Sequence, residues 1–216
     1  ISQALAQELE RCGGNIRLNT EIEAIQQSPD KRWRLHLKDG TALLADFVFS
    51  TIPLTSLVKC IQPGPPPAVM QAGEQLRFRG MVLHYLVLET GQFTPFDAHY
   101  FPESHILFSR MSEPRNYSAA VQPKGKTGLC FEIPCQVGDQ IWQLSDAQVT
   151  ERVLQDLEKM GLAVRCPVLK AFSVRLPFVY PVYDLAFAEN LALLNDYLSS
   201  MTGLVSLGRQ GLFVHD

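Results

Sequence analysis

The sequence of 216 residues predicts an α/β protein of mixed α+β type, in which one domain is interrupted by the insertion of another. Residues 47–52 and 204–207 are almost continuously apolar, which is typical of strands covered on both faces. The long segment between them carries apolar strands and amphipathic helices. The chain leaves a first layer of structure and returns to it near its end. This order indicates a discontinuous domain, with an inserted mixed antiparallel sheet and its helices.

The first part of the chain is predicted to be a helix followed by short strands. Leu5 and Leu9 lie on one face of a helix over residues 2–11. Asp39 and Gly40 favour a hairpin turn, because this pair adopts positive φ at little cost. Strands are expected at residues 16–18, 22–27, 32–37 and 43–52, the last of them ended by Pro53.

The proline-rich segment 62–67 is the clearest boundary in the sequence, because it forms a stiff connector. Further along, Ser145 and Gln148 form a capping-box pattern that begins a helix over residues 147–160. Other elements are expected as helices at 68–76 and 185–200 and as strands at 80–88, 106–109, 128–134, 169–176 and 204–207. The resulting domains are residues 1–58 with 203–216, and an inserted domain of residues 59–202.

Composition argues against several classes of function. A net charge of −3 and a pI near 6.0 give no electrostatic basis for binding nucleic acid or an anionic membrane. No apolar run reaches the roughly 18 residues of a transmembrane helix, and the first residues do not read as a signal peptide. The five cysteines are odd in number and scattered, which suits a reduced, cytoplasmic protein. Cys130 and Cys135 lack further ligands at zinc spacing, so no metal site is expected.

Both ends of the chain predict an internal segment of a larger protein. Ile1 leads directly into a helix with no strand before it. Residues 208–216 read as a turn that would normally open a helix, and the sequence stops before a helix is expected to form.

Two stretches of the sequence resemble the FAD-dependent amine oxidoreductase superfamily, which includes monoamine oxidases, protoporphyrinogen oxidase, phytoene desaturases and UDP-galactopyranose mutase. The first is LAQELERCGGNIRLNTEIEAI, residues 5–25. The second is ADFVFSTIPL, residues 45–54, which follows Asp39 and Gly40 at the family's spacing. The order and spacing of these motifs are fairly specific for the superfamily and weak for any one reaction.

A narrower set of motifs resembles the branch that contains UDP-galactopyranose mutase and protoporphyrinogen-oxidase-like proteins. It comprises FSRMSEPRN at residues 108–116, YPVY at residues 180–183, and Gly208-Arg209-x-Gly211-x-Phe213. The mutase pattern usually has Tyr at the position of His215, which counts against a mutase.

The resemblance implies a partial FAD-binding Rossmann-like domain in the two outer segments and a substrate domain in the inserted one. Such proteins begin with a strand, a GxGxxG turn and a helix that hold the FAD pyrophosphate. The sequence contains no GxGxxG, so FAD is expected in the intact parent and weakly or not at all in this segment alone. The residues implied to border the cofactor are Ile22, Ser50, Thr51, Pro53, Gly208, Arg209 and Gly211.

An ordinary structural role stays open for each of these residues. The two glycines would let the backbone approach the flavin or pyrophosphate, and Arg209 would present donors. The alternative is a strand-to-helix turn with a surface arginine, and the resemblance favours the first interpretation. Ile22 could be a core strand residue, and Ser50, Thr51 and Pro53 could equally be a capped strand end.

The candidate substrate residues are Arg110, Tyr180, Tyr183 and His215. Arginine pairs with carboxylates and phosphates through two hydrogen bonds, and tyrosine suits a sugar or a flavin face. The alternative for the segment 112–116, which includes Arg115, is a surface loop with a local salt bridge. No catalytic nucleophile or carboxylate pair can be assigned from spacing.

The resemblance implies that the intact parent is an FAD-dependent oxidoreductase that removes hydride from a C–N or C–C bond of a small molecule. A non-redox, flavin-dependent UDP-sugar mutase is the alternative enzyme, and a catalytically silent binding or oligomerisation module is the alternative outside enzymes. The apolar strands at 47–52 and 204–207 lack neighbours in this segment. We therefore expect self-association of the segment or pairing with a missing N-terminal part.

Overall fold

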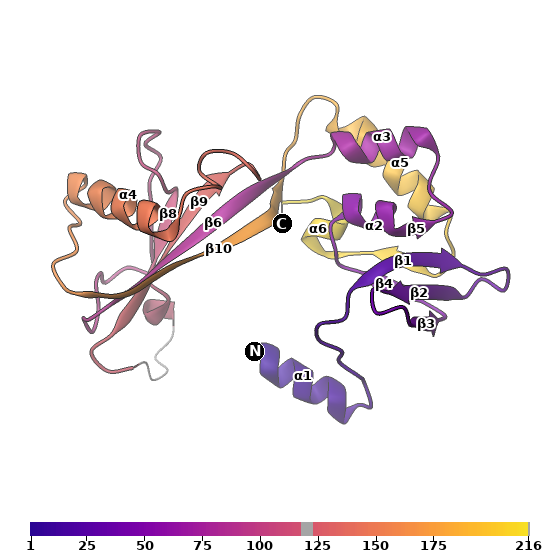
Figure 1. The fold of residues 1–216 in the computed structure, drawn as a ribbon, viewed down its shortest axis with the longest axis horizontal. Helices are drawn as coiled ribbons and strands as arrows, with labels where there is room; N and C mark the ends of the chain where they lie inside the picture. The colour runs from indigo at the N-terminus through magenta and orange to yellow at the C-terminus, as the bar shows by residue number, and fades with distance from the viewer. Residues whose placement is uncertain (118–122, 216) are drawn as a thin grey trace. The chain divides into compact units, whose positions relative to one another are not determined.

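The computed structural model describes residues 1–117 and 123–215 and divides them into two compact units (Figure 1). The first unit comprises residues 1–76 and 184–214, and the second comprises residues 77–183 with His215. Residues 59–76 and 184–202, which we expected in the inserted domain, pack in the first unit. The assignment of a cofactor to one unit and a substrate to the other stays a prediction.

The first unit contains a small mixed sheet with the strand order β3-β2-β1-β5. Strands β1 (Ile22–Gln27), β2 (Trp33–Leu37) and β3 (Ala42–Ala45) form an antiparallel meander, and β5 (Ile61–Gln62) runs parallel to β1. Trp33 is fully buried, and its indole N–H donates to the carbonyl of Thr202 at 3.0 Å. Trp33 therefore ties this sheet to the C-terminal part of the unit.

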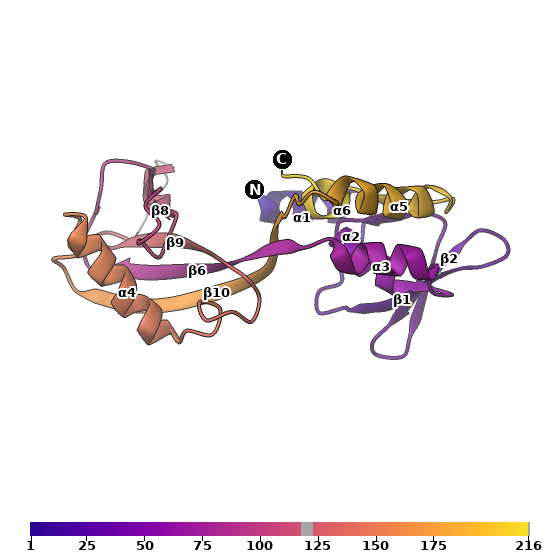
Figure 2. The same ribbon diagram turned by 90° about the horizontal axis from the view of Figure 1, so that it is seen from above.

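A separate pair of parallel strands belongs to the same unit. Strand β4 (Val48–Ser50) pairs with β11 (Leu204–Ser206). The helices of the unit are α1 (Ser2–Arg11), α2 (Leu54–Cys60), α3 (Pro67–Gln75), α5 (Phe187–Ser199) and the short α6 (Gly208–Leu212). Helices α3 and α5 lie side by side (Figures 1 and 2). Leu54, Leu194 and Phe213 are fully buried in this unit, whereas α1 buries no residue.

The second unit is built on an antiparallel sheet with the strand order β10-β6-β9-β8-β7. Strand β6 (Phe78–Leu88) lies between β10 (Val168–Pro181) and β9 (Thr127–Cys135). Strands β8 (Arg110–Ser112) and β7 (Ala98–Tyr100) extend the sheet beyond β9, and the 3-10 helix η1 (Pro114–Tyr117) follows β8.

Helix α4 (Asp146–Lys159) covers one face of this sheet (Figure 2). The predicted capping box is confirmed, because Ser145 and Gln148 each accept a hydrogen bond at the start of the helix. Val82 and Leu86 of β6 join Val153 of α4 in one core, and all three are fully buried. Alternate residues of a strand point to opposite faces, so the odd-numbered residues of β6 face away from α4. We call that second side of the sheet the open face, since several of its side chains are partly or fully exposed.

Most of the elements form where the sequence predicts them, and three predicted strands do not. Residues 16–18 form no strand, and Leu18 is 80% exposed, because no described strand pairs with this segment. Residues 106–109 are also not a strand; Ile106 and Phe108 are buried in a loop of the core, and the next strand begins at Arg110.

The predicted strand over residues 43–52 is divided into β3 and β4, which belong to different sheets. The segment after β11 also differs from prediction. It forms α6 rather than a turn alone, and Phe213 ends the helix at a φ of 55°. Helix α2, directly after Pro53, was not predicted.

Candidate functional site

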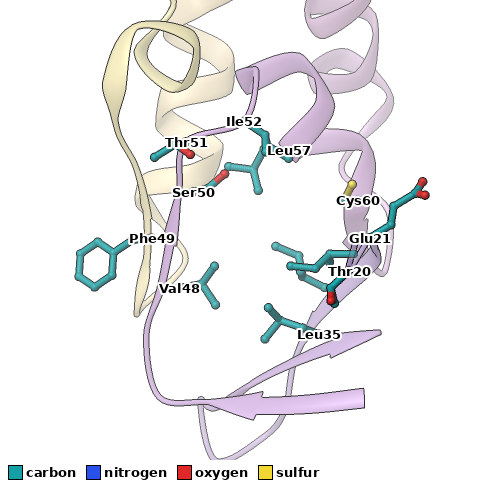
Figure 3. Close-up of a pocket in the computed structure, with 12 residues that line it drawn as sticks. Thr20, Glu21, Leu35, Val48, Phe49, Ser50, Thr51, Ile52, Leu57 and Cys60 are labelled. Carbon is teal, nitrogen blue, oxygen red and sulfur yellow. The ribbon is translucent and has the colours of Figure 1, made fainter. Parts of the chain in front are cut away.

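A pocket of about 390 Å³ opens in the first unit between β1 and β4 (Figure 3). The start of β1 forms one wall, the end of β4 forms another, and α2 closes a third side. The pocket is lined by Thr20, Glu21, Ile22, Ile25, Leu35, Val48, Phe49, Ser50, Thr51, Ile52, Leu57 and Cys60. We call it the first-unit pocket.

The first-unit pocket is mainly apolar. Leu35 and Val48 point into it, whereas the ring of Phe49 lies on the other side of its strand (Figure 3). Ser50 and Thr51 add hydroxyl groups at the end of β4. Glu21 is the one charged residue among the described residues that line it. A neutral group therefore suits this pocket better than a phosphate, because the walls are mainly apolar and none of the described lining residues is a cation.

Three of the seven predicted cofactor residues line the first-unit pocket, namely Ile22, Ser50 and Thr51. Pro53, Gly208, Arg209 and Gly211 do not line it. Pro53 begins α2, where its carbonyl accepts hydrogen bonds from the backbone N–H groups of Ser56 and Leu57. A structural role at a helix start therefore explains Pro53 without a ligand.

Gly211 also has a structural explanation. A Cβ atom at this position would lie 2.8 Å from Ser206 Oγ and 3.2 Å from the carbonyl oxygen of Ser50. Glycine is thus required for α6 to pack against β4 and β11. Gly208 begins the helix at a φ of 77°, and Arg209 is exposed.

A second pocket of about 310 Å³ lies on the open face of the second unit. It brings together three of the four predicted substrate residues, Arg110, Tyr180 and His215, which come from three distant parts of the sequence. Its lining residues are Arg79, Met81, Tyr100, Ser109, Arg110, Glu132, Pro134, Tyr180 and His215. We call it the Arg110 pocket.

Arg110 is held in place from two sides. Its guanidinium forms an ion pair with Glu132 on the neighbouring strand β9 and lies 6.0 Å from the centroid of the Tyr100 ring. The hydrogen bond with Glu132, and then that with Tyr100, raise the pKa of Arg110 above its ordinary value. The Arg110 Nε atom is buried and has no hydrogen-bond partner in the described part of the chain. The pocket thus holds a permanently charged donor with unused bonding capacity.

The rings of Tyr180 and His215 form a flat wall of the same pocket. Their centroids are 4.5 Å apart and their planes differ by 9°, which is a stacked arrangement. Tyr183, the fourth predicted substrate residue, is 48% exposed and does not line the pocket. It follows the end of β10, so the alternation that places Tyr180 on the open face no longer applies to it.

The segment 112–116 is not a surface loop with a local salt bridge. Glu113 is fully buried, and its carboxylate accepts hydrogen bonds from the backbone N–H groups of Phe93 and Thr94 at 2.9 and 2.8 Å. The Thr127 hydroxyl donates a further one at 2.6 Å. Glu113 therefore anchors the loop before β7 to the start of β9.

Sequence reasoning missed the other six residues of the Arg110 pocket, among them the charged or aromatic Arg79, Tyr100 and Glu132. One available signal was Glu132, a single acidic residue within the apolar strand predicted at 128–134. An acid on the uncovered side of such a strand indicates a cationic partner nearby.

Two kinds of feature are absent from the described residues, namely a metal-binding cluster and a membrane-spanning helix. In residues 1–117 and 123–215, no cluster of three or more His, Cys, Asp or Glu side chains is arranged to hold a metal ion. None of the helices in this part of the chain has the length and apolar content needed to cross a bilayer.

Comparison with known proteins identifies the family. The model of the family described as flavin containing amine oxidoreductase matches residues 1–175. This chain belongs to the flavin-containing amine oxidoreductase family. Members of the family bind FAD and act on small-molecule substrates. A comparison with curated protein sequences gives no match.

Solved structures of the same fold include three kinds of flavoprotein. Reduced UDP-galactopyranose mutase matches with a TM-score of 0.81 at 17% identity, over 99% of this chain and 45% of that one. A putative protoporphyrinogen oxidase from Exiguobacterium sp. 255-15 matches with a TM-score of 0.69 at 23% identity, over 94% and 45%. Putrescine oxidase bound to putrescine matches with a TM-score of 0.68 at 12% identity, over 100% and 49%. The chain therefore spans about half the length of these proteins.

Proposed function

We propose that the intact protein containing this chain is an FAD-dependent oxidoreductase that removes hydride from a C–N or C–C bond of a small molecule. The observation that carries this proposal is the convergence of Arg110, Tyr180 and His215 in one pocket on the open face. Family membership supports FAD as the cofactor class. A cytoplasmic location, expected from five free cysteines, belongs to the same proposal.

In this proposal the residues of the Arg110 pocket bind and orient the substrate. Glu132 fixes the orientation of the Arg110 guanidinium, which then presents N–H donors to a carboxylate or phosphate of the substrate. The stacked rings of Tyr180 and His215 offer a flat surface for a sugar or another ring. FAD, when bound, supplies the hydride acceptor.

The first-unit pocket would border a neutral part of FAD, with Ile22, Ser50 and Thr51 as its contacts. The residues fit such a role because the walls are apolar and carry hydroxyl groups at the end of β4. No cation lines the pocket among the described residues, and the sequence has no GxGxxG turn for the pyrophosphate. We therefore propose that this chain alone binds FAD weakly or not at all. Isothermal titration is expected to show no saturable heat, and micromolar affinity would contradict this part of the proposal.

The proposed reaction is tested on the full-length protein. Anaerobic mixing with candidate amines and C–H donors is expected to bleach the flavin band at about 450 nm for the true substrate class. Arg110→Ala is expected to raise KM more than it lowers kcat, because it removes binding rather than hydride transfer. Arg165→Ala is the matched control, since Arg165 is exposed and lies outside the pocket. Unchanged KM in the Arg110 variant would refute the assignment of the pocket.

A non-redox UDP-sugar mutase is the second candidate enzyme. The structural match to reduced UDP-galactopyranose mutase, with its TM-score of 0.81, favours it. His215 in place of the tyrosine of the mutase pattern speaks against it. The anaerobic assay of flavin reduction distinguishes the two reactions, because a mutase interconverts sugar rings with no net reduction of the flavin.

A catalytically silent oligomerisation module is the candidate outside enzymes. Strands β4 and β11 pair only with each other among the described strands, and Phe47, Phe49 and Val205 beside them are exposed. Exposed apolar strands favour association with a further strand, from another copy or from an N-terminal part of the protein. Light scattering of the chain is expected to show a mass that rises with concentration. A strictly monomeric mass at high concentration would rule out self-association.

A further inference from the structure

A third pocket, of about 280 Å³, lies at the other end of the open face. Tyr85 and Val87 of β6 and Gly128 of β9 form its floor, and Arg115 and Lys126 stand at its sides. Val87 is eight positions along β6 from Arg79 of the Arg110 pocket, which corresponds to about 26 Å of strand. The two pockets are therefore separate sites on the same face.

The charged residues that line this third pocket, among those described, are both cations. Neither Arg115 nor Lys126 forms an ion pair with any carboxylate of the described residues. The Arg115 Nη1 atom is buried and has no hydrogen-bond partner within residues 1–117 and 123–215. None of the described residues that line the pocket is acidic. A buried guanidinium nitrogen without a partner is costly, which favours an anionic group bound nearby.

The adjacent Glu113 forms no ion pair with Arg115 or Lys126 among the described residues, and its carboxylate is bonded to other groups. Its carboxylate already accepts hydrogen bonds from two backbone N–H groups and from the Thr127 hydroxyl. Both carboxylate oxygens are engaged in holding the loop before β7.

The floor of the pocket continues into a pair of aromatic rings. Tyr85 stacks on Phe172 of β10, with 5.0 Å between centroids and an angle of 14° between planes. Lys170 Nζ lies 5.0 Å from the centroid of the Phe172 ring, which adds a third cation to this end of the open face. A flat aromatic floor with cations around it suits a planar ring that carries a negative charge.

We propose that the pocket between Arg115 and Lys126 binds a planar aromatic group that carries a phosphate or a carboxylate. Arg115 and Lys126 contact the anion, and Tyr85 contacts the ring. This site is independent of the proposed redox function, because it shares no residue with the Arg110 pocket.

The test titrates this chain with phenyl phosphate as the probe. Two-dimensional NMR follows the backbone amide signals during the titration. Titration is expected to shift the amide signals of Lys126 and Gly128 in a saturable way. Arg115→Gln and Lys126→Gln are each expected to weaken binding about tenfold, the loss that follows from removing one charge-assisted contact. Arg115→Lys, which keeps the charge but loses the planar fork, is expected to lie between the parent and Arg115→Gln.

Lys124→Gln is the matched control, because Lys124 is two positions from Lys126, is exposed and does not line the pocket. A loss of affinity in Lys124→Gln as large as in Lys126→Gln would overturn the proposal, since it would indicate general attraction to a basic surface. Inorganic phosphate that binds as tightly as phenyl phosphate would overturn the role of the aromatic floor. Absence of saturable shifts with phenyl phosphate would overturn the site itself.

Discussion

The two units of the chain bury their apolar surface to different extents. In the second unit, α4 and the surrounding loops cover one face of a large sheet, and Phe131, Val153 and Leu157 are fully buried between them. In the first unit, β4 and β11 are each three residues long and form a sheet of two strands. Phe49 is 68% exposed beside them. The second unit therefore has a core of its own, whereas part of the first unit has apolar surface that no described residue covers.

This difference identifies the apolar surface that remains available for contact with a further segment of chain. Short parallel strands are normally covered on both faces, because their connections place helices there. No described residue covers the pair β4–β11 on the side of Phe49, while the open face of the second unit carries charged pockets at both ends. The uncovered apolar surface thus lies in the unit proposed to border FAD, whereas the described residues of the candidate substrate pocket belong to the second unit.

The largest effect is expected from the same substitution made once in each unit. Phe131→Ala removes a fully buried ring from the core of the second unit and is expected to lower the free energy of unfolding of that unit by about 3–5 kcal/mol. Phe49→Ala removes an exposed ring and is expected to change the stability of the first unit by less than about 0.5 kcal/mol.

One tryptophan in each unit allows the two to be measured separately. The indole N–H signals of Trp33 and Trp142, followed by NMR during urea titration, report the first and second units respectively. Loss of stability in Phe49→Ala comparable to that in Phe131→Ala would contradict the difference between the units.

The next largest effect is expected at Glu113. Glu113→Ala leaves two backbone N–H groups and the Thr127 hydroxyl without their acceptor and is expected to destabilise the second unit by about 2–3 kcal/mol. The control is Glu103→Ala, which removes an exposed carboxylate in the same unit and is expected to change stability by less than about 0.5 kcal/mol. The Trp142 signal during urea titration again provides the measurement. Equal values for the two variants would show that the buried network contributes nothing.

The elements that sequence analysis predicted correctly are those specified by local patterns. Ser145 and Gln148 specify the start of α4 through hydrogen bonds that span three residues, and residues 22–27 form β1 with the expected bounds. The prediction of a strand at 106–109 is wrong, because its apolar residues belong to a buried loop. The backbone N–H of Leu107 donates to the Asp156 carboxylate of α4 at 2.9 Å, so a contact 49 residues away fixes this segment.

The candidate site was predictable only in part, for a related reason. Arg110, Tyr180 and His215 were chosen from residue type and resemblance, and the structure places them in one pocket. Tyr100 and Glu132 join them because the register of the sheet sets both opposite Arg110, on the strands to either side. Cross-strand register depends on pairing between residues far apart in sequence, and a single sequence does not reveal it.

The smallest effect that we expect is a dependence of the stability of the second unit on pH. His84 on β6 is fully buried, with its two ring nitrogens 2.9 Å from the Ser173 hydroxyl and 3.1 Å from the Thr150 hydroxyl. Burial lowers the pKa of His84, and the charge of Asp146 opposes this only in part. The unfolded chain therefore binds a proton at a higher pH than the folded one, and the stability contributed by neutral His84 is present above about pH 6.5 and lost as the pH falls.

Urea titrations of the second unit between pH 7.5 and 5 are expected to show a loss of at most about 1.4 kcal/mol per pH unit from this one group. His84→Gln keeps a side chain that can hydrogen-bond to both hydroxyls and cannot acquire the proton, so its stability is expected to fall less steeply over the same range. The Trp33 signal serves as the internal control, because His84 lies outside the first unit and its substitution should leave that unit's pH dependence unchanged. An identical slope for the parent and His84→Gln in the Trp142 signal would show that the buried imidazole is protonated at no cost to the fold.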